Sequence, residues 1–280
     1  MTIGAAILLG IVQGVAEFLP ISSSGHLSVL QNLFGTSAAG EGHMFFDVLL
    51  HLGTLISICI MYWQEITDIA REVIGSLGSV LMRAPRSVST GEPIKRQGEN
   101  LPARRLFFMI VLATLPLFVI LPFNDKIESL YYNTTFIGVM FILTGALLFV
   151  SDKMHAGQKT EKNMKVLDAL TIGCCQAVAT IPGLSRSGTT ITAGIAVGLD
   201  RSFAVSFSFL MSLPAVLGAN ILAFVDAAKE GVVWANVPAY LVGMLVATLM
   251  GILTISIMKL IAKKSRFSYF SYYCVGIGML

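Results

Sequence analysis

Long apolar stretches alternate with short polar ones along most of the chain. A helix that crosses the hydrocarbon layer of a membrane needs roughly 20 mostly apolar residues, because the layer is about 30 Å thick and each residue rises about 1.5 Å. Five stretches meet this length and a sixth is shorter. We predict transmembrane helices at residues 45–63, 106–123, 134–151, 203–225, 237–258 and 267–280.

Two further apolar stretches, residues 1–40 and 166–200, are interrupted by Pro, Gly and Ser. Broken backbone at membrane depth is tolerated only where protein or a wet cavity surrounds it. We therefore predict that each is a re-entrant hairpin of two half-helices. The expected fold class is an all-α integral membrane protein with six transmembrane helices and two re-entrant broken-helix hairpins, in one membrane domain over residues 1–280.

Composition agrees with this pattern. The 280 residues are 55% hydrophobic and 12% charged, whereas a soluble domain is typically about 25% charged. We expect membrane lipids around most of the chain and no nucleic-acid partner.

Basic side chains gather in three of the connecting loops, at residues 64–105, 152–165 and 259–266, whereas the other two loops carry only Lys126 and Lys229. The positive-inside rule places the three basic loops in the cytoplasm. For the spans to alternate, residues 1–40 must begin and end outside. Residues 166–200 must begin and end on the cytoplasmic side.

The two interrupted stretches resemble each other. Residues 10–26 and 173–189 share Gly, Gln, Val, Ala, Ser, Ser and Gly at seven of seventeen corresponding positions. Three spans follow each copy, so the second copy enters the membrane upside down relative to the first. We predict an inverted-topology repeat, with repeat one at about 1–160 and repeat two at about 161–280. In such folds the broken helices meet near the midplane around a shared site.

The first copy carries an acid, serines and a histidine. Gln13 and Glu17 are four residues apart and so share one face of the half-helix that Pro20 ends. Serines at a helix start offer hydroxyls beside free backbone N–H groups, which favour phosphate. The predicted anion-binding turn consists of Ser22, Ser23, Ser24, Gly25 and His26.

The second copy supplies a cation. Arg186 lies in an otherwise apolar stretch, and its guanidinium can bind phosphate oxygens through two parallel hydrogen bonds. An ionisable residue inside a membrane is expensive and by default indicates a functional site. Together with Gln13 of the first copy, the accompanying candidates for substrate binding are Ser185, Ser187, Gly188 and Thr190.

Simpler interpretations stay open. Glu17 and Arg186 could form a structural ion pair, the serines could only cap half-helices, and His26 could be a buried histidine with satisfied hydrogen bonds. For Asp47 and His51, which are four residues apart in the first span, we favour a supporting role over a catalytic one. Three further charged residues are expected to be interfacial charges and helix caps: Asp168, Asp200 and Arg201.

Together the two motifs resemble a known family. Residues 13–26, containing Glu-Phe-Leu-Pro-Ile-Ser-Ser-Ser-Gly-His, and residues 182–190, Pro-Gly-Leu-Ser-Arg-Ser-Gly-Thr-Thr, resemble the undecaprenyl-diphosphatase family, also known for bacitracin resistance. The resemblance implies a bacterial inner-membrane hydrolase that converts undecaprenyl diphosphate to undecaprenyl phosphate and inorganic phosphate. This lipid carrier serves peptidoglycan synthesis, and the active site is expected to face outside.

The resemblance also implies roles for single residues. It assigns catalysis to Glu17, Ser23, His26 and Arg186, and a divalent cation, Mg²⁺ or Ca²⁺, with Glu17 as its ligand. Gln13 stands where many members have a second glutamate. One fewer carboxylate weakens Mg²⁺ binding unless substrate oxygens supply most ligands, as they commonly do. Whether the protein forms a homodimer is left open.

The chemistry and the function each have rivals. Ser23 is the preferred nucleophile, deprotonated by His26 or Glu17, but direct attack by His26 or by an activated water also fits the sequence. Inverted repeats with broken helices are typical of transporters, so a flippase for polyprenyl phosphate is the main alternative. An acid-phosphatase-like enzyme would need a second His downstream of Ser185-Arg186, and none follows.

Overall fold

The regular structure of the described residues is helical. A computed structural model describes residues 1–33, 43–81, 101–155, 157–230, 233–264 and 267–280. Within these ranges every regular element is a helix, and one isolated β-bridge joins Lys159 to Leu199. The predicted all-α class is confirmed for the described residues.

Four helical stretches of the described chain are long and apolar enough to cross a membrane. Each overlaps a predicted span. They are Pro102–Phe123 (α5 Leu101–Thr114, α6 Leu117–Ile120 and η1 Leu121–Phe123), Thr134–Lys153 (α8), Arg201–Val225 (within α11, Arg201–Glu230) and Trp234–Lys264 (η3 Trp234–Asn236 and α12 Val237–Lys264). These helices agree with an integral membrane protein.

The first predicted span is the first half of a bent pair. Helix α3 (His43–Met61) and helix α4 (Trp63–Leu81) meet at an angle of 81°. The sequence had assigned residues 64–81 to a loop, and that assignment is wrong. Helix α4 is amphipathic: Ile66 and Ile69 pack on the buried core, whereas Glu65 and Arg71 are exposed.

The sixth predicted span corresponds to α13 (Ser268–Met279), which is 12 residues long and packs along α8. Two other short apolar helices are α1 (Ile3–Ala16) and α9 (Val166–Val178). The count of six spans therefore stays a prediction. Between η1 and α8 lie α7 (Asn124–Ser129) and η2 (Leu130–Tyr132).

Both predicted hairpins contain a helix break. Helix α1 gives way to α2 (Ser23–Leu33), and helix α9 gives way to α10 (Arg186–Ala196). Pro20 and Gly183 lie in the two turns. Ser22 has a φ of 69° and Gly183 a φ of 88°, in the left-handed region that side chains other than Gly rarely adopt.

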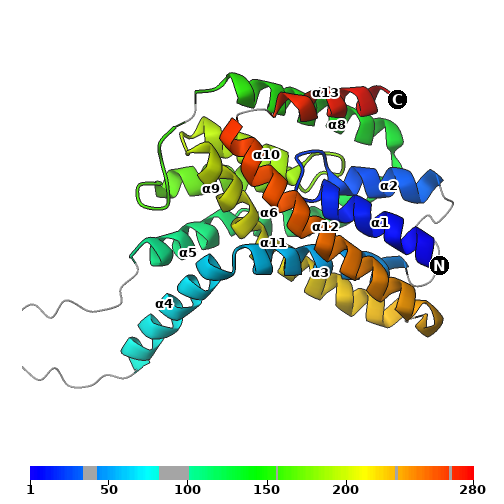
Figure 1. The fold of residues 1–280 in the computed structure, drawn as a ribbon, viewed down its shortest axis with the longest axis horizontal. Coiled ribbons are helices and arrows are strands. Elements are labelled where there is room, and N and C mark those ends of the chain that lie inside the picture. The colour runs from blue at the N-terminus through cyan, green and yellow to red at the C-terminus, as the bar shows by residue number, and fades with distance from the viewer. Residues whose placement is uncertain (34–42, 82–100, 156, 231–232, 265–266) are drawn as a thin grey trace, which may run out of the picture.

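Glycines let the short apolar helices approach their neighbours. A Cβ added to Gly10 of α1 would lie 2.5 Å from the carbonyl oxygen of Gly243 on α12. A Cβ added to Gly173 of α9 would lie 2.4 Å from the carbonyl oxygen of Ala113 on α5. Figure 1 shows α1 and α2 toward one end of the molecule and α9 and α10 toward the other.

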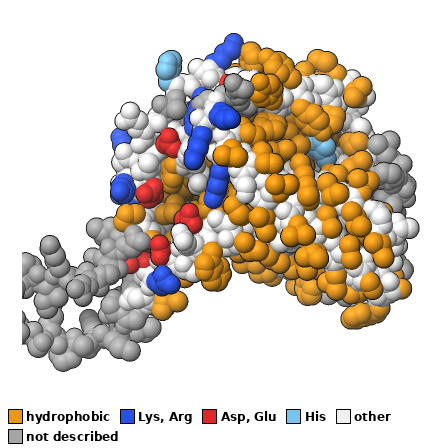
Figure 2. All heavy atoms as spheres, in the orientation of Figure 1, with side chains coloured by type: hydrophobic (Ala, Val, Ile, Leu, Met, Phe, Trp, Pro, Cys, Tyr) orange, Lys and Arg blue, Asp and Glu red, His pale blue; other side chains and the backbone are white. Residues whose placement is uncertain are grey.

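Charge is distributed unevenly over the surface. Figure 2 shows apolar side chains over most of the visible face, with Lys, Arg, Asp and Glu gathered toward the end that carries α4. Three charged residues contact the ends of helices, as the sequence predicted. Asp168 accepts from the N–H of Lys165, Asp200 accepts from the N–H of Phe203, and Arg201 donates to the carbonyl of Ser151.

Candidate functional site

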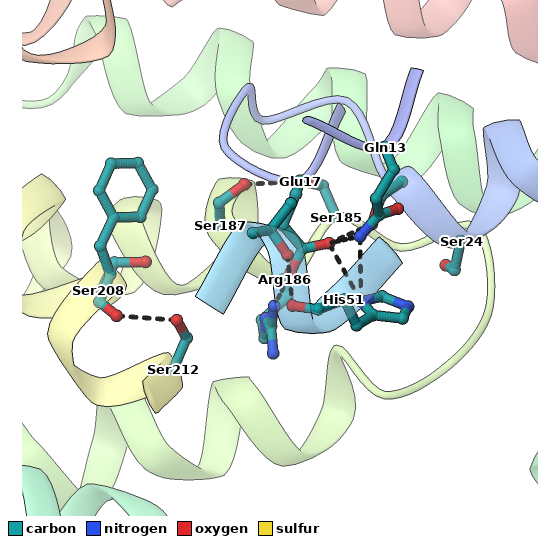
Figure 3. Close-up of polar contacts among 12 residues, drawn as sticks. Gln13, Glu17, Ser24, His51, Ser185, Arg186, Ser187, Ser208 and Ser212 are labelled. Carbon is teal, nitrogen blue, oxygen red and sulfur yellow. Dashed lines mark hydrogen bonds and ion pairs between the residues drawn. The ribbon is translucent and has the colours of Figure 1, made fainter. Parts of the chain in front are cut away.

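A single buried carboxylate joins the two helix breaks. The Glu17 side chain is only 5% exposed. Its Oε2 accepts a hydrogen bond from Ser23 Oγ at 2.6 Å and another from Gln13 Nε2 at 3.1 Å. Its Oε1 forms a short ion pair with Nη2 of Arg186 (Figure 3). The structure thus brings together the acid and the guanidinium that the sequence placed 169 residues apart.

A serine side chain caps the N-terminus of the helix that follows each break. The N–H of Gly25 donates to Ser22 Oγ at 3.4 Å, and the N–H of Gly188 donates to Ser185 Oγ at 3.1 Å. A side-chain oxygen at this position satisfies a backbone donor that the helix itself cannot. Ser23 therefore begins α2 and Arg186 begins α10.

The two breaks also contact each other directly. Ser187 Oγ donates to the carbonyl of Leu19 at 3.2 Å. A Cβ added to Gly25 would lie 3.3 Å from Cα of Gly183, and one added to Gly188 would lie 3.3 Å from Cβ of Pro20. An added Cβ at either glycine would be in tight contact with the other break, and this close approach brings the start of α10 to Glu17.

The remaining serine and threonine candidates contact neighbouring polar groups. Ser24 Oγ lies 3.3 Å from Ser22 Oγ. Thr190 Oγ1 donates to the carbonyl of Arg186 at 2.8 Å and lies 2.5 Å from Ser208 Oγ on α11. These contacts fix the backbone near Arg186, and a direct role in substrate binding stays a prediction for Ser24 and Thr190.

Both ring nitrogens of His26 have hydrogen-bond partners other than Ser23. Its Nδ1 lies 2.7 Å from the carbonyl oxygen of Ser22, which can only accept, so Nδ1 carries the proton. In the neutral ring, Nε2 then accepts from the hydroxyl of Tyr273 on α13 at 2.7 Å. Since both nitrogens are engaged elsewhere, the geometry offers Glu17 rather than His26 as the group that takes the Ser23 proton.

His51 belongs to the site, although it was absent from the predicted site residues. Its Nδ1 lies 3.0 Å from Gln13 Nε2 and 3.9 Å from Glu17 Oε2 (Figure 3). The sequence signal was the Asp47-to-His51 spacing on one face of a span. This spacing does not reveal that His51 contacts Gln13, because that contact joins α3 to α1.

One oxygen of the site has no donor. Gln13 is fully buried, and its Oε1 has no hydrogen-bond partner in the described structure. A buried polar atom without a partner costs about 1–3 kcal/mol. No cluster of three or more His, Cys, Asp or Glu suited to a metal occurs among the described residues. A bound cation would therefore need further oxygens beyond Gln13 Oε1 and Glu17, and a diphosphate could supply them.

Fold and site together define an all-α integral membrane protein that brings an acid, a serine and an arginine to one buried point between two broken helices. The chain belongs to the family described as bacitracin resistance protein BacA, whose model matches residues 6–280. The resemblance drawn from the two motifs is confirmed.

Relatives named undecaprenyl-diphosphatase match nearly the whole chain. The one from Methanosphaera stadtmanae is 36% identical over 278 residues, covering 99% of this chain and 95% of the relative. The one from Alkaliphilus metalliredigens is 38% identical over 281 residues, covering 100% and 98%. The one from Pelotomaculum thermopropionicum is 36% identical over 280 residues, covering 100% and 95%.

Proposed function

We propose that this protein hydrolyses undecaprenyl diphosphate to undecaprenyl phosphate and inorganic phosphate, and that Glu17, Ser23 and Arg186 perform the reaction. The observation that carries the proposal is the pair of contacts to Glu17, one from the hydroxyl of Ser23 and one from the guanidinium of Arg186. A base beside a hydroxyl and a cation beside both are the parts that phosphoryl transfer requires.

In the first step, Ser23 Oγ attacks the terminal phosphorus while Glu17 Oε2, 2.6 Å away, takes its proton. The new Oγ–P bond forms as the bond from phosphorus to the bridging oxygen breaks. Undecaprenyl phosphate leaves with that oxygen. Water then cleaves the phosphoserine, inorganic phosphate departs, and the proton returns from Glu17 to Ser23. The competing route is direct attack by a water that Glu17 activates.

Arg186 and the N-termini of α2 and α10 stabilise the negative charge of the diphosphate. The Arg186 side chain is 29% exposed, so part of the side chain remains accessible while its guanidinium is paired with Glu17. The diphosphate would bind this accessible part. Helices α2 and α10, each of 11 residues, begin at the site, and their N-terminal N–H groups favour negative charge.

A divalent cation, Mg²⁺ or Ca²⁺, completes the proposal, with Glu17 and Gln13 Oε1 as its protein ligands. Such an ion neutralises charge on phosphate oxygens. The unpartnered Gln13 oxygen supports this assignment, and most remaining ligands would come from the diphosphate and water, as is common for Mg²⁺.

The finer topology is part of the same proposal: six spans, two re-entrant hairpins and an inverted repeat. Reciprocal contacts support it. In the repeat, Gly188 corresponds to Gly25 and Gly183 to Pro20. Gly25 closely approaches Gly183, and Gly188 closely approaches Pro20. The pairing of α1 with α12 is likewise matched by that of α9 with α5.

The site is proposed to open to the outside of the inner membrane. Lys126 in α7 is exposed and lies on the charge-poor side of the predicted topology. A cysteine placed there should react with an impermeant thiol reagent on whole cells. A cysteine near Lys95, outside the described residues, should react only after lysis. Labelling at both positions would contradict the orientation. Whether two copies form a homodimer is a separate question, for light scattering in detergent.

Phosphate release tests the function. Purified protein in detergent, given undecaprenyl diphosphate, should release inorganic phosphate, and a chelator should stop the release. A Ser23→Ala protein should release almost none. A flippase would release no phosphate and would not need the Ser23 hydroxyl, so phosphate release separates the two functions without a transport assay.

A further inference from the structure

The side-chain amide of Gln13 lies between two acceptors. Its Nε2 is 3.1 Å from Glu17 Oε2 and 3.0 Å from His51 Nδ1. An amide nitrogen carries two hydrogens, and the ionised Glu17 that pairs with Arg186 can only accept. One hydrogen therefore goes to Glu17, and the other is directed at His51.

This arrangement fixes the state of His51. Its Nδ1 must accept, so in the neutral ring the proton lies on Nε2. The reverse orientation of Gln13 would bring Oε1 against the Glu17 carboxylate, where two acceptors would repel. An acceptor at His51 thus selects the amide orientation that also binds Glu17.

We infer that His51 is a positioning residue of the active site: its Nδ1 orients the Gln13 amide, and the amide holds Glu17 Oε2 against Ser23. This role rests on the proposed function and adds to it a residue on α3. The polar contacts of the His51 ring within the described residues are with Gln13 and Glu17 alone. The His51 side chain is 34% exposed, compared with 5% for Glu17. We therefore assign the role of His51 to its contact with Gln13 and not to burial of the side chain.

The same contact keeps Gln13 Nε2, rather than Oε1, hydrogen-bonded to Glu17. That oxygen is the buried atom without a donor. With His51 in place, Oε1 stays available to a cation or to a protonated phosphate.

Three substitutions of His51 test which of its two ring nitrogens is required for activity. Asn places an oxygen near the position of Nδ1, Gln places its amide near Nε2, and Leu removes both. His51→Asn should keep kcat close to that of the unsubstituted protein. His51→Leu and His51→Gln should lower kcat about 10- to 100-fold, the usual cost of removing an orienting partner. An active His51→Gln beside an inactive His51→Asn would overturn the proposal, and so would a fully active His51→Leu.

A double-variant cycle tests whether the effect passes through Gln13. In a Gln13→Leu background, His51→Leu should cost little more, because residues that act through one another are not additive. Losses that multiply would overturn the proposal. His155→Asn and His155→Leu are matched controls, since His155 is exposed just after α8. Thermal unfolding of each variant in detergent identifies those that fail to fold.

A spectroscopic measurement tests the contact independently of activity. In protein labelled with ¹⁵N-histidine at neutral pH, the resonances that disappear in His51→Asn identify the His51 ring. They should report an unprotonated Nδ1 in the unsubstituted protein and should shift in Gln13→Leu. A proton on Nδ1 would refute the positioning role even if phosphate release is normal. If the unsubstituted protein releases no phosphate, the proposed function fails, whereas the tautomer result still stands.

Discussion

Ser23 and Arg186 occupy the same position in the two helix breaks and bind the two oxygens of one carboxylate. Each is the first residue of its helix, α2 or α10, and each follows a serine whose hydroxyl caps that helix. Ser23 donates to Oε2 of Glu17, and Arg186 pairs with Oε1. Corresponding positions of two similar sequence motifs thus carry a hydroxyl in one and a cation in the other.

Removing the Ser23 hydroxyl should abolish turnover without unfolding the protein. Ser23→Ala is expected to lower kcat on the order of 10³-fold or more, as loss of a nucleophile does in other enzymes. Phosphate release measures it. Ser28→Ala on the same helix is the control, because the Ser28 hydroxyl donates only to the carbonyl of Tyr131. Undiminished turnover by Ser23→Ala would remove Ser23 from the mechanism.

Arg186→Lys separates catalysis from a structural ion pair. Lysine keeps the positive charge near Glu17 but cannot bind phosphate with two parallel hydrogen bonds. The thermal midpoint should stay close to that of the unsubstituted protein, while kcat falls about 10²- to 10³-fold, the typical cost of losing an anion-stabilising donor. Normal turnover together with normal stability would favour the purely structural interpretation.

The close helix contacts should fail when a methyl group is added. In Gly173→Ala the new Cβ would meet the Ala113 carbonyl oxygen at 2.4 Å, so we expect destabilisation of about 1–3 kcal/mol from overpacking. Gly4→Ala is the control, since nothing lies within 4 Å of its added Cβ and alanine favours a helix. Thermal unfolding in detergent compares the two. Equal stability would show that α9 can move away from α5.

Acid should weaken the junction between α9 and residues 159–165, which Asp168 holds together. Burial raises the pKa of Asp168, but hydrogen bonds from Lys159 and from the Lys165 N–H lower it more, so the net pKa lies below the ordinary value of 3.8. A lowered folded-state pKa contributes stability that is present above the ordinary value and is lost as pH falls through the folded-state pKa.

The thermal midpoint should therefore decline as pH is lowered to about 4 and below. In Asp168→Asn it should start lower at neutral pH and depend less on pH. Asp68→Asn is the control, because Asp68 forms an exposed ion pair with Arg71 on α4. Identical acid profiles for Asp168→Asn and the unsubstituted protein would contradict the assignment.

Cation dependence should respond to position 13. Chelator should stop phosphate release, and Mg²⁺ or Ca²⁺ should restore it. Gln13→Glu adds a carboxylate, so the cation concentration for half-maximal activity should fall. A cation requirement unchanged by Gln13→Glu, and by removal of the side-chain oxygen in Gln13→Leu, would exclude Gln13 as a ligand.

The sequence alone located the four long spans and both helix breaks. Hydrophobic length and the backbone chemistry of residues such as Pro20 and Gly183 act within about 20 residues, so they can be recognised without knowing any neighbour. The repeat and the charge pattern also identified Glu17 and Arg186 as members of one site. They did so because a buried charge in a membrane requires a partner.

Only the tertiary structure decided the orientation of the histidines. His26 bonds to Tyr273 on α13 rather than to Ser23, and His51 joins the site through Gln13. The apolar pattern also did not reveal the 81° bend between α3 and α4. The histidine orientations depend on contacts between residues far apart in the chain. A hydrogen bond of about 3 Å is set by how whole helices dock, and local sequence does not specify that docking.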